Sequence, residues 1–142
     1  MTAATHNAGA SITVRLPVRL DELDYLGIVH SSTYLKYMEH ARVKLLEQQG
    51  VDLLAWVKRG VRAVVVNDTV NYRQPATYGD ELAITCSVED LGESAAKLRY
   101  SIVEQRTGKA ILQATTTIVS IDPAGKPIPI PAEVREALSR PA

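Results

Sequence analysis

One amphipathic helical segment, standing among alternating strand patterns, most constrains how this chain can fold. The segment covers roughly Ser32 to Gln49, because Ser or Thr at positions 31–33 can cap its start and Gly50 suits its end. Its broad apolar stripe comprises Tyr34, Met38, Ala41 and Leu45, flanked by Leu35, Tyr37 and Leu46. A helix with such a stripe must bury it, so we expect a sheet to pack against it.

Strand patterns lie on both sides of this helix. Before it, the alternation of Ile12, Val14, Leu16 and Val18 indicates a strand, and Pro17 makes that strand an edge or bulged one. After it, residues 62–72 are rich in β-branched residues, and three further strand patterns follow within residues 82–121, the last two joined by the turn RTGK. Short helical segments are expected in VDLLAWVKRG and PAEVREALSRPA. This order predicts an α+β fold in which an antiparallel sheet of about five strands wraps around one long helix.

Length and composition indicate a single domain with no net charge. The chain has 142 residues, of which the first ten are small and polar, so we expect a disordered tail at residues 1–10 and one domain at residues 11–142. Sixteen basic and sixteen acidic residues give no net charge, which disfavours nucleic acid or an anionic membrane as a partner. The single cysteine, the lack of a secretory pattern and the lack of a long apolar run predict a cytoplasmic protein without a membrane span. The exposed face and edge of so small a sheet favour pairing with a second subunit.

The stretch LDYLGIVHSSTYLKYMEHAR, residues 23–42, contains the pattern D-x-x-G-x-V followed by Y-L-x-x-M-E-x-A-R. Together with VNYRQPATYGDEL and ATTTIVSIDPAGKPIPIP, it resembles the hotdog-fold acyl-CoA thioesterases of the 4-hydroxybenzoyl-CoA thioesterase family. The resemblance covers nearly the whole chain after the first ten residues. It implies a hotdog domain that hydrolyses acyl-CoA or acyl-carrier protein, forms a homodimer or homotetramer with sites at the subunit interface, and needs neither a metal nor a cofactor beyond the CoA of its substrate.

The resemblance also implies catalytic roles at the start of the helix. Asp24 takes the position of the family's acidic residue, which attacks the thioester carbonyl or activates water. The backbone N–H of Ser31 becomes the expected oxyanion donor, and Gly27 allows the tight turn between the carboxylate and the helix. The chemistry agrees, because thioester hydrolysis needs a nucleophile or base on one side of the carbonyl and hydrogen-bond donors on the other. The start of a helix offers such donors and a positive dipole end.

Three neighbouring residues are expected to contact the substrate. His30 occupies a position that varies in the family and can line the acyl pocket, although an ordinary polar histidine at a helix entry is equally consistent. Tyr34 can contact the substrate or belong to the core. Thr33 stands where several relatives carry Asn, so any side-chain hydrogen bond made there must differ.

This chain has no obvious basic turn that could bind the phosphates of the CoA nucleotide. Some family members bind the phosphates with basic residues at the turn after the third strand, where this chain has Gly92, Glu93 and Ser94. Lys97 and Arg99 are the predicted substitutes, and Arg62 and Arg106 are further candidates from either subunit. A carrier-protein-bound acyl group is therefore an alternative to free acyl-CoA.

Other interpretations of these residues remain open. Asp24 could simply cap a turn, and Glu39 could supply a helix carboxylate or pair with Lys36 or Arg42. Cys86 occupies an apolar slot in its strand pattern and is expected to be a buried filler rather than a nucleophile.

Two other classes of function compete with hydrolysis. A non-catalytic acyl-ligand or regulatory module on the same scaffold would keep the groove without turnover. A hotdog dehydratase or hydratase would need a different pairing of histidine and acid. His30 is the only histidine close to the proposed site, because His40 is expected to face solvent.

Overall fold

The computed structural model describes residues 9–141. Most of the expected N-terminal tail therefore lies outside the described residues. Ala10, inside the expected tail, is fully buried. Its N–H donates to the carbonyl of Leu138 (3.0 Å), and its carbonyl accepts from the N–H of Val88 (2.9 Å). The packed part of the chain thus begins before Ser11.

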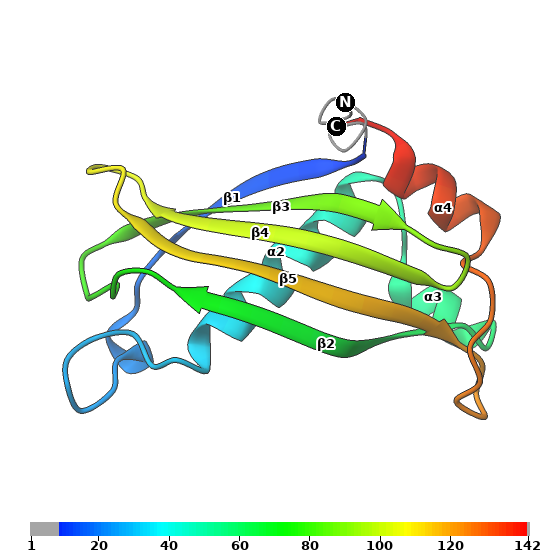
Figure 1. Cartoon of the computed structure of the whole chain (residues 1–142), viewed down its shortest axis with the longest axis horizontal. Coiled ribbons are helices and arrows are strands. Elements are labelled where there is room, and N and C mark those ends of the chain that lie inside the picture. The colour runs from blue at the N-terminus through cyan, green and yellow to red at the C-terminus, as the bar shows by residue number, and fades with distance from the viewer. Residues whose placement is uncertain (1–8, 142) are drawn as a thin grey trace.

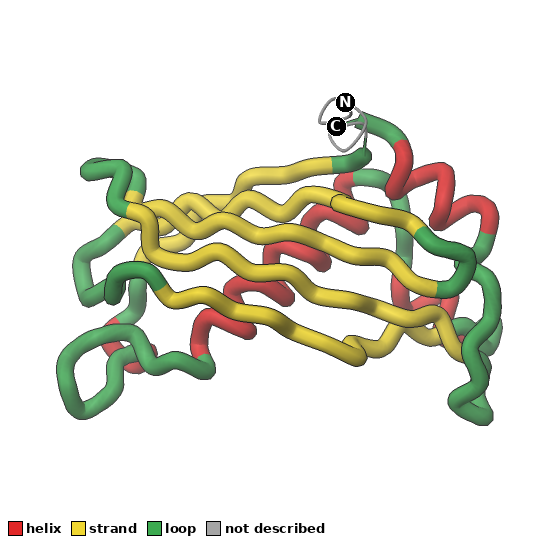
Figure 2. The backbone as a smooth tube through the Cα atoms, in the orientation of Figure 1, coloured by secondary structure: helices red, strands yellow, loops and turns green. Residues whose placement is uncertain are grey.

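A five-stranded antiparallel sheet with the order β1-β3-β4-β5-β2 forms the body of the protein (Figures 1 and 2). Its strands are β1 Ser11–Pro17, β2 Arg62–Tyr72, β3 Glu81–Leu91, β4 Ala95–Glu104 and β5 Ala110–Ile121. The predicted number of strands and the α+β class are confirmed. Pro17 ends edge strand β1, as expected for a residue that cannot donate a backbone hydrogen bond.

Helix α2, Thr33–Gln48, crosses one face of this sheet, and it packs on β1 and β3 (Figure 1). Its buried side chains are those of Tyr34, Tyr37, Met38, Ala41 and Leu45, which confirms the predicted stripe. Leu35, predicted as a flank of that stripe, is 42% exposed, because the helix contacts only part of the sheet and leaves this side uncovered.

Two short helices close one end of the sheet (Figure 1). Helix α3, Leu53–Lys58, begins where the Asp52 carboxylate accepts from the N–H of Ala55 (3.2 Å). Helix α4, Ala132–Ser139, is tied to the end of α2, because the Gln49 amide donates to the carbonyls of Ala137 (2.7 Å) and Arg140 (3.0 Å). A single 3-10 turn, η1 Leu20–Glu22, lies at the opposite end, before α2.

Between the sheet and α2, alternate residues of the central strands form the core. On β3 these are Leu82, Ile84, Cys86 and Val88, as the alternation predicts. Cys86 is fully buried, and this burial raises the pKa of its thiol to about 12. A buried thiol with so high a pKa is not a nucleophile, so its interpretation as a core filler is confirmed.

The buried carboxylate of Glu104 ties the β4–β5 turn to the start of β3. It accepts hydrogen bonds from the N–H groups of Glu81 (2.9 Å), Arg106 (2.9 Å) and Thr107 (3.0 Å). The hydrogen bond from Glu81 has the largest effect on the pKa of Glu104, and the bonds from Thr107 and Arg106 act in the same direction. Together they outweigh the effect of burial and lower this pKa to about 2. Ionised Glu104 therefore favours the folded state.

This pKa leads to a prediction for acid stability. Because the folded-state pKa lies below the ordinary value of 4.5, the stabilisation by Glu104 is complete above that value and is lost as the pH falls towards 2. Glu104→Gln should lower the melting temperature at pH 7, and the difference from wild type should shrink between pH 5 and pH 2, roughly the interval between the two pKa values. Thermal unfolding across this pH range measures both effects. A difference that stays constant down to pH 2 would contradict the assignment.

Candidate active site

A cleft of about 350 Å³ lies at the N-terminal end of α2. One wall is the loop that leads into the helix, and it includes Asp24, His30 and Ser31. The other wall is the end of β2 with the residues that follow it. The structure thus brings together four of the predicted site residues. Asp24, His30 and Ser31 come from the loop, and Tyr34 comes from the first turn of α2.

Asp24 opens a tight turn that its own side chain stabilises. Its carbonyl accepts from the N–H of Gly27 (3.0 Å), and its Oδ1 accepts from the N–H of Leu26 (2.8 Å). Gly27 has a φ of +81°, a conformation that side chains with a Cβ rarely adopt. The turn-capping role considered for Asp24 is therefore present. It uses one carboxylate oxygen, and Oδ2 accepts no hydrogen bond from residues 9–141, so it can face a ligand in the cleft.

Ser31 has a free backbone donor and lines the same cleft as this carboxylate. It lies just before Ser32, which occupies the N-cap position of α2 without a capping hydrogen bond from its side chain. Its carbonyl accepts from the Tyr72 hydroxyl (3.3 Å), whereas its N–H donates to no acceptor within the described part of the chain. An unpaired N–H at the positive end of a helix can stabilise a negatively charged oxygen.

His30 caps the helix start from inside the cleft. Its Nδ1 accepts from the N–H of Ser32 (3.1 Å) and lies 2.8 Å from the Ser32 hydroxyl. Because a backbone N–H can only donate, this geometry assigns the proton of the neutral imidazole to Nε2. The exposed ring therefore offers a donor to the cleft.

Tyrosines from two elements meet at the base of the cleft. Tyr34 is 3% exposed, and its hydroxyl accepts from the N–H of Ala76 (3.2 Å). Burial raises the pKa of Tyr34, so the phenol stays protonated at neutral pH. The ring of Tyr72 lies 5.7 Å from that of Tyr34 in an edge-to-face arrangement. Tyr34 is thus a core residue that also lines the cleft.

The sequence analysis missed the contribution of residues 72–75. Arg73 brings a guanidinium group to the cleft, where its Nη2 donates to the side chain of Gln113 (3.1 Å). Tyr72 and Gln74 complete this wall. The sequence marks these positions only as the end of a strand before a proline, and no local pattern shows that they face the start of α2.

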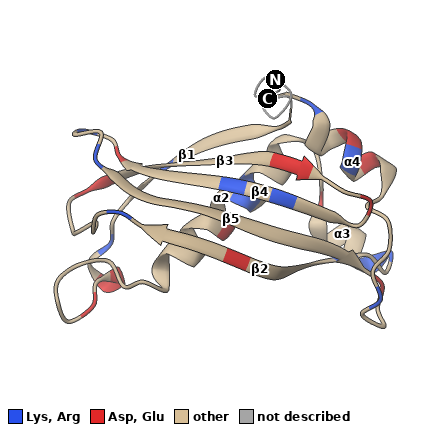
Figure 3. Cartoon of the chain, in the orientation of Figure 1, with Lys and Arg blue, Asp and Glu red and all other residues tan. Residues whose placement is uncertain are grey.

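Lys97 and Arg99 lie elsewhere in the single chain. Both side chains are on β4 and approach the carboxylate of Glu89 on β3, each at 3.5 Å. Arg99 lines a polar hollow among the Thr, Ser, Asn and Gln side chains of neighbouring strands. Figure 3 shows basic and acidic positions interspersed over the ribbon, without a large region of one sign.

The remaining candidate residues do not line the Asp24 cleft. Thr33 is the first residue of α2. Arg106 donates to the carbonyl of Gly79, and Arg62 lies at the opposite end of α2. Glu39 is exposed and forms no ion pair with another residue in the described chain, so the alternative in which it pairs with Lys36 or Arg42 is not observed.

Two features are absent from residues 9–141. No group of three or more His, Cys, Asp and Glu side chains in this region is arranged to hold a metal ion. Nor does this part of the chain contain a helix long and apolar enough to cross a membrane.

Comparison with known proteins identifies the family. Residues 18–138 match the model of the Thioesterase-like superfamily. The chain belongs to this superfamily. The predicted family, hotdog fold and thioesterase class are thereby confirmed.

Individual relatives agree with this assignment. The chain is 32% identical over 128 residues to the long-chain acyl-CoA thioesterase FadM of Escherichia coli, and the match covers 89% of this chain and 96% of that protein. A thioesterase of Thermus thermophilus complexed with coenzyme A and Zn is 29% identical, with a TM-score of 0.77 and coverage of 89% and 90%. A 1,4-dihydroxy-2-naphthoyl-CoA thioesterase from Synechocystis, 21% identical with coverage of 90% and 95%, has the same fold with a TM-score of 0.86.

Proposed function

We propose that the chain hydrolyses acyl thioesters in the cleft at the N-terminal end of α2. The observation that carries this proposal is that the Asp24 carboxylate and the unpaired N–H of Ser31 line one cleft. The first supplies a nucleophile or base, and the second supplies a donor for the oxygen that becomes negatively charged. Hydrolysis needs both groups on opposite sides of one carbonyl.

The free oxygen of Asp24 can act in two ways. As a base it takes a proton from water while the water oxygen attacks the carbonyl carbon, and as a nucleophile it attacks that carbon itself and forms an anhydride that water then opens. In both routes the carbonyl oxygen becomes an oxyanion that accepts from Ser31, and the C–S bond breaks to release the thiolate. A thiolate is a good leaving group, because thiols have pKa values of about 8.5.

The proposed substrate is an acyl-CoA, with an acyl-carrier protein as the alternative. FadM, similar along nearly its whole length, is named a long-chain acyl-CoA thioesterase, and the related Thermus protein was crystallised with coenzyme A. Arg73 is the cation in the cleft and is a candidate partner for the nucleotide phosphates. Lys97 and Arg99 remain candidates through a partner subunit. No metal and no separate cofactor take part in the proposal, and a cytoplasmic location would suit such a substrate.

We further propose that β2 joins two copies of the chain. It is an eleven-residue edge strand whose only partner in the described chain is β5. Val65, Val66 and Tyr72 on this strand are 44%, 57% and 54% exposed. A long, apolar, unpaired edge favours association with a second sheet. Since Tyr72 also lines the cleft, this pairing would place the site beside the interface.

A non-catalytic acyl-ligand module on the same scaffold remains the alternative function. It would bind acyl thioesters in the cleft without releasing thiol. Thiol release from a panel of acyl-CoA and acyl-carrier-protein substrates with the purified protein distinguishes the two functions. A chain that binds these compounds but releases no thiol would refute hydrolysis.

Replacement of the carboxylate tests the mechanism. Asp24→Asn should fold normally, because Asn retains the Oδ1 that accepts from Leu26. It should lower kcat by at least ~100-fold, since an amide is neither a base nor a nucleophile. Glu39→Gln is the matched control and should cost far less. A folded Asp24→Asn variant with near wild-type turnover would remove Asp24 from the mechanism. A larger loss in Glu39→Gln, together with a mild effect of Asp24→Asn, would favour Glu39 as the catalytic carboxylate.

Replacement of the cations tests how CoA is held. Each charge-assisted contact contributes about 1.5–3 kcal/mol, so loss of the phosphate contact should raise KM for acyl-CoA by roughly 10- to 100-fold. We expect this effect for Arg73→Ala and no change with acyl-pantetheine, which lacks the nucleotide. Lys97→Ala and Arg99→Ala show whether a partner subunit contributes. If all three variants process acyl-CoA like wild type, these residues do not bind the nucleotide.

Replacement at the edge strand tests the oligomer. Val66→Lys should convert the dimer to a monomer, because a charged side chain on the exposed edge of a strand opposes its pairing with a second sheet. Leu54→Lys is the control, since Leu54 is 76% exposed on α3 rather than on β2. Light scattering after gel filtration gives the masses. A monomeric wild type, or a Val66→Lys variant with the wild-type mass, would refute pairing through β2.

A further inference from the structure

The loop that carries Asp24 is folded into a small hairpin. Its two arms meet where the N–H of Asp24 donates to the carbonyl of Ile28 (2.8 Å). At its base, the N–H of His30 donates to the carbonyl of Glu22 (2.9 Å). We call residues 22–30 the Asp24 hairpin. A contact that fixes the base of this hairpin also fixes the orientation of the carboxylate near its tip.

Glu22 joins the base of the hairpin to two other segments. Its Oε1 accepts from the N–H of Arg19 (2.8 Å) and from the Tyr37 hydroxyl on α2 (2.7 Å). Hydrogen bonds to a carboxylate are among the stronger ones in proteins. Glu22 is not among the residues that line the catalytic cleft. Its contacts therefore indicate a role in holding the hairpin, without contact to a substrate.

Tyr37 is the buried partner of this contact. Its side chain is 4% exposed, and its ring lies 5.9 Å from that of Tyr34 at an interplanar angle of 80°. Burial, followed by the hydrogen bond to Glu22, raises the pKa of Tyr37, so the hydroxyl remains protonated and can donate. A buried hydroxyl is costly to leave unpaired, so this bond has one preferred geometry.

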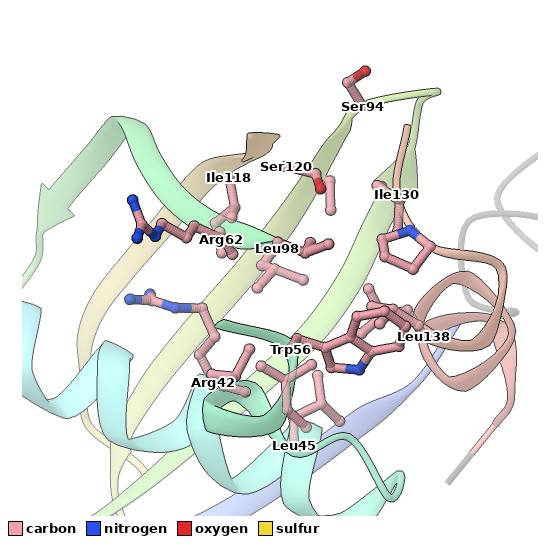
Figure 4. Close-up of a pocket in the computed structure, with 17 residues that line it drawn as sticks. Arg42, Leu45, Trp56, Arg62, Ser94, Leu98, Ile118, Ser120, Ile130 and Leu138 are labelled. Carbon is pink, nitrogen blue, oxygen red and sulfur yellow. The ribbon is translucent and has the colours of Figure 1, made fainter. Parts of the chain in front are cut away.

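Helix α2 gives the hairpin a firm support. It packs on β1 and β3, and at its far end it borders a second, apolar cavity of about 80 Å³. Leu45 of α2 lines this cavity with Trp56 of α3 and Leu138 of α4, while Arg42 and Arg62 extend from one side of it (Figure 4). Closely packed elements resist displacement. A hydrogen bond from Tyr37 therefore ties the hairpin to a part of the fold that is held along its length.

We propose that the hydrogen bond between Tyr37 and Glu22 positions the Asp24 hairpin for catalysis. The inference rests on the proposed function, because it concerns the placement of the Asp24 carboxylate relative to the N–H of Ser31. Asp24 lies two residues after Glu22, and Ser31 directly follows His30, whose N–H is bonded to Glu22. Glu22 thus controls both arms, and a misplacement of about 1 Å can lower a rate about 100-fold.

Kinetics of thiol release from an acyl-CoA test this role. Tyr37→Phe keeps the buried ring and removes only the donor, whereas Glu22→Ala removes the acceptor. Each should lower kcat about tenfold and change KM less than about twofold, because neither side chain lines the cleft. The double variant should lose no more than about the larger single loss, since both changes break one bond.

A conservative variant separates positioning from a direct chemical role. Glu22→Gln keeps an Oε1 that can accept from Tyr37, so its kcat should stay within about threefold of wild type. Equal losses in Glu22→Gln and Glu22→Ala would show that the charge, and not the hydrogen bond, is required, and would overturn the proposal. A raised KM with an unchanged kcat in Tyr37→Phe would also overturn it.

A core variant controls for stability. Val88→Ala leaves a cavity in β3, away from the hairpin, so it should lower the melting temperature and leave kcat unchanged. A kcat loss in Val88→Ala equal to that in Tyr37→Phe, at a similar melting temperature, would show only a general effect of destabilisation and would overturn the proposal.

Hydrogen exchange measures the hairpin independently of catalysis. The amides of residues 22–30 should exchange about tenfold faster in Tyr37→Phe and Glu22→Ala than in wild type or Val88→Ala. Unchanged exchange would overturn the anchor, and faster exchange with an unchanged kcat would overturn its role in catalysis. A wild type that releases no thiol would overturn the proposed function and the catalytic role together, whereas the exchange result would still confirm or overturn the anchor.

Discussion

The packing of α2 against the sheet is the contact on which the core and both ends of the helix depend. Met38, Ala41 and Leu45 are at most 1% exposed, and each large apolar side chain buried in this way contributes roughly 1.5–3 kcal/mol. The same contact fixes where both ends of the helix lie. One end carries the Asp24 cleft, and the other forms a wall of the apolar cavity.

The loop before α2 combines structural and candidate catalytic roles in the same residues. Asp24 stabilises its turn with Oδ1 while Oδ2 remains available, and His30 accepts from the N–H of Ser32 through Nδ1 while the residue lines the cleft. A carboxylate held by its own turn needs little reorganisation during a reaction, which is the physical advantage of preorganised groups. The free N–H of Ser31 arises in the same way, because the start of a helix necessarily leaves donors unpaired.

The two ends of α2 offer different chemistry within one small domain. Polar groups, one arginine and apolar residues such as Ile28 and Val29 line the proposed catalytic cleft. Apolar side chains with two arginines at one side form the second cavity. The long β2 edge runs from Arg62 at the cavity to Tyr72 at the cleft, so an association through this edge would influence both regions.

Local sequence patterns were enough to predict the elements, and the family resemblance of one short segment pointed to the loop that carries the candidate catalytic groups. Helical periodicity predicted α2, strand alternation predicted the buried face that includes Cys86, and Asp24 and Ser31 lie within one short segment, so their proximity is a local property. The clustering of Arg73 and Tyr72 with that segment emerged only in the folded chain, since it depends on how β2 pairs with β5 and where β2 ends. The same pairing of strands placed Lys97 and Arg99 beside Glu89 and away from the cleft. Distances between residues far apart in sequence follow from strand order and register, which a single sequence does not encode in any local pattern.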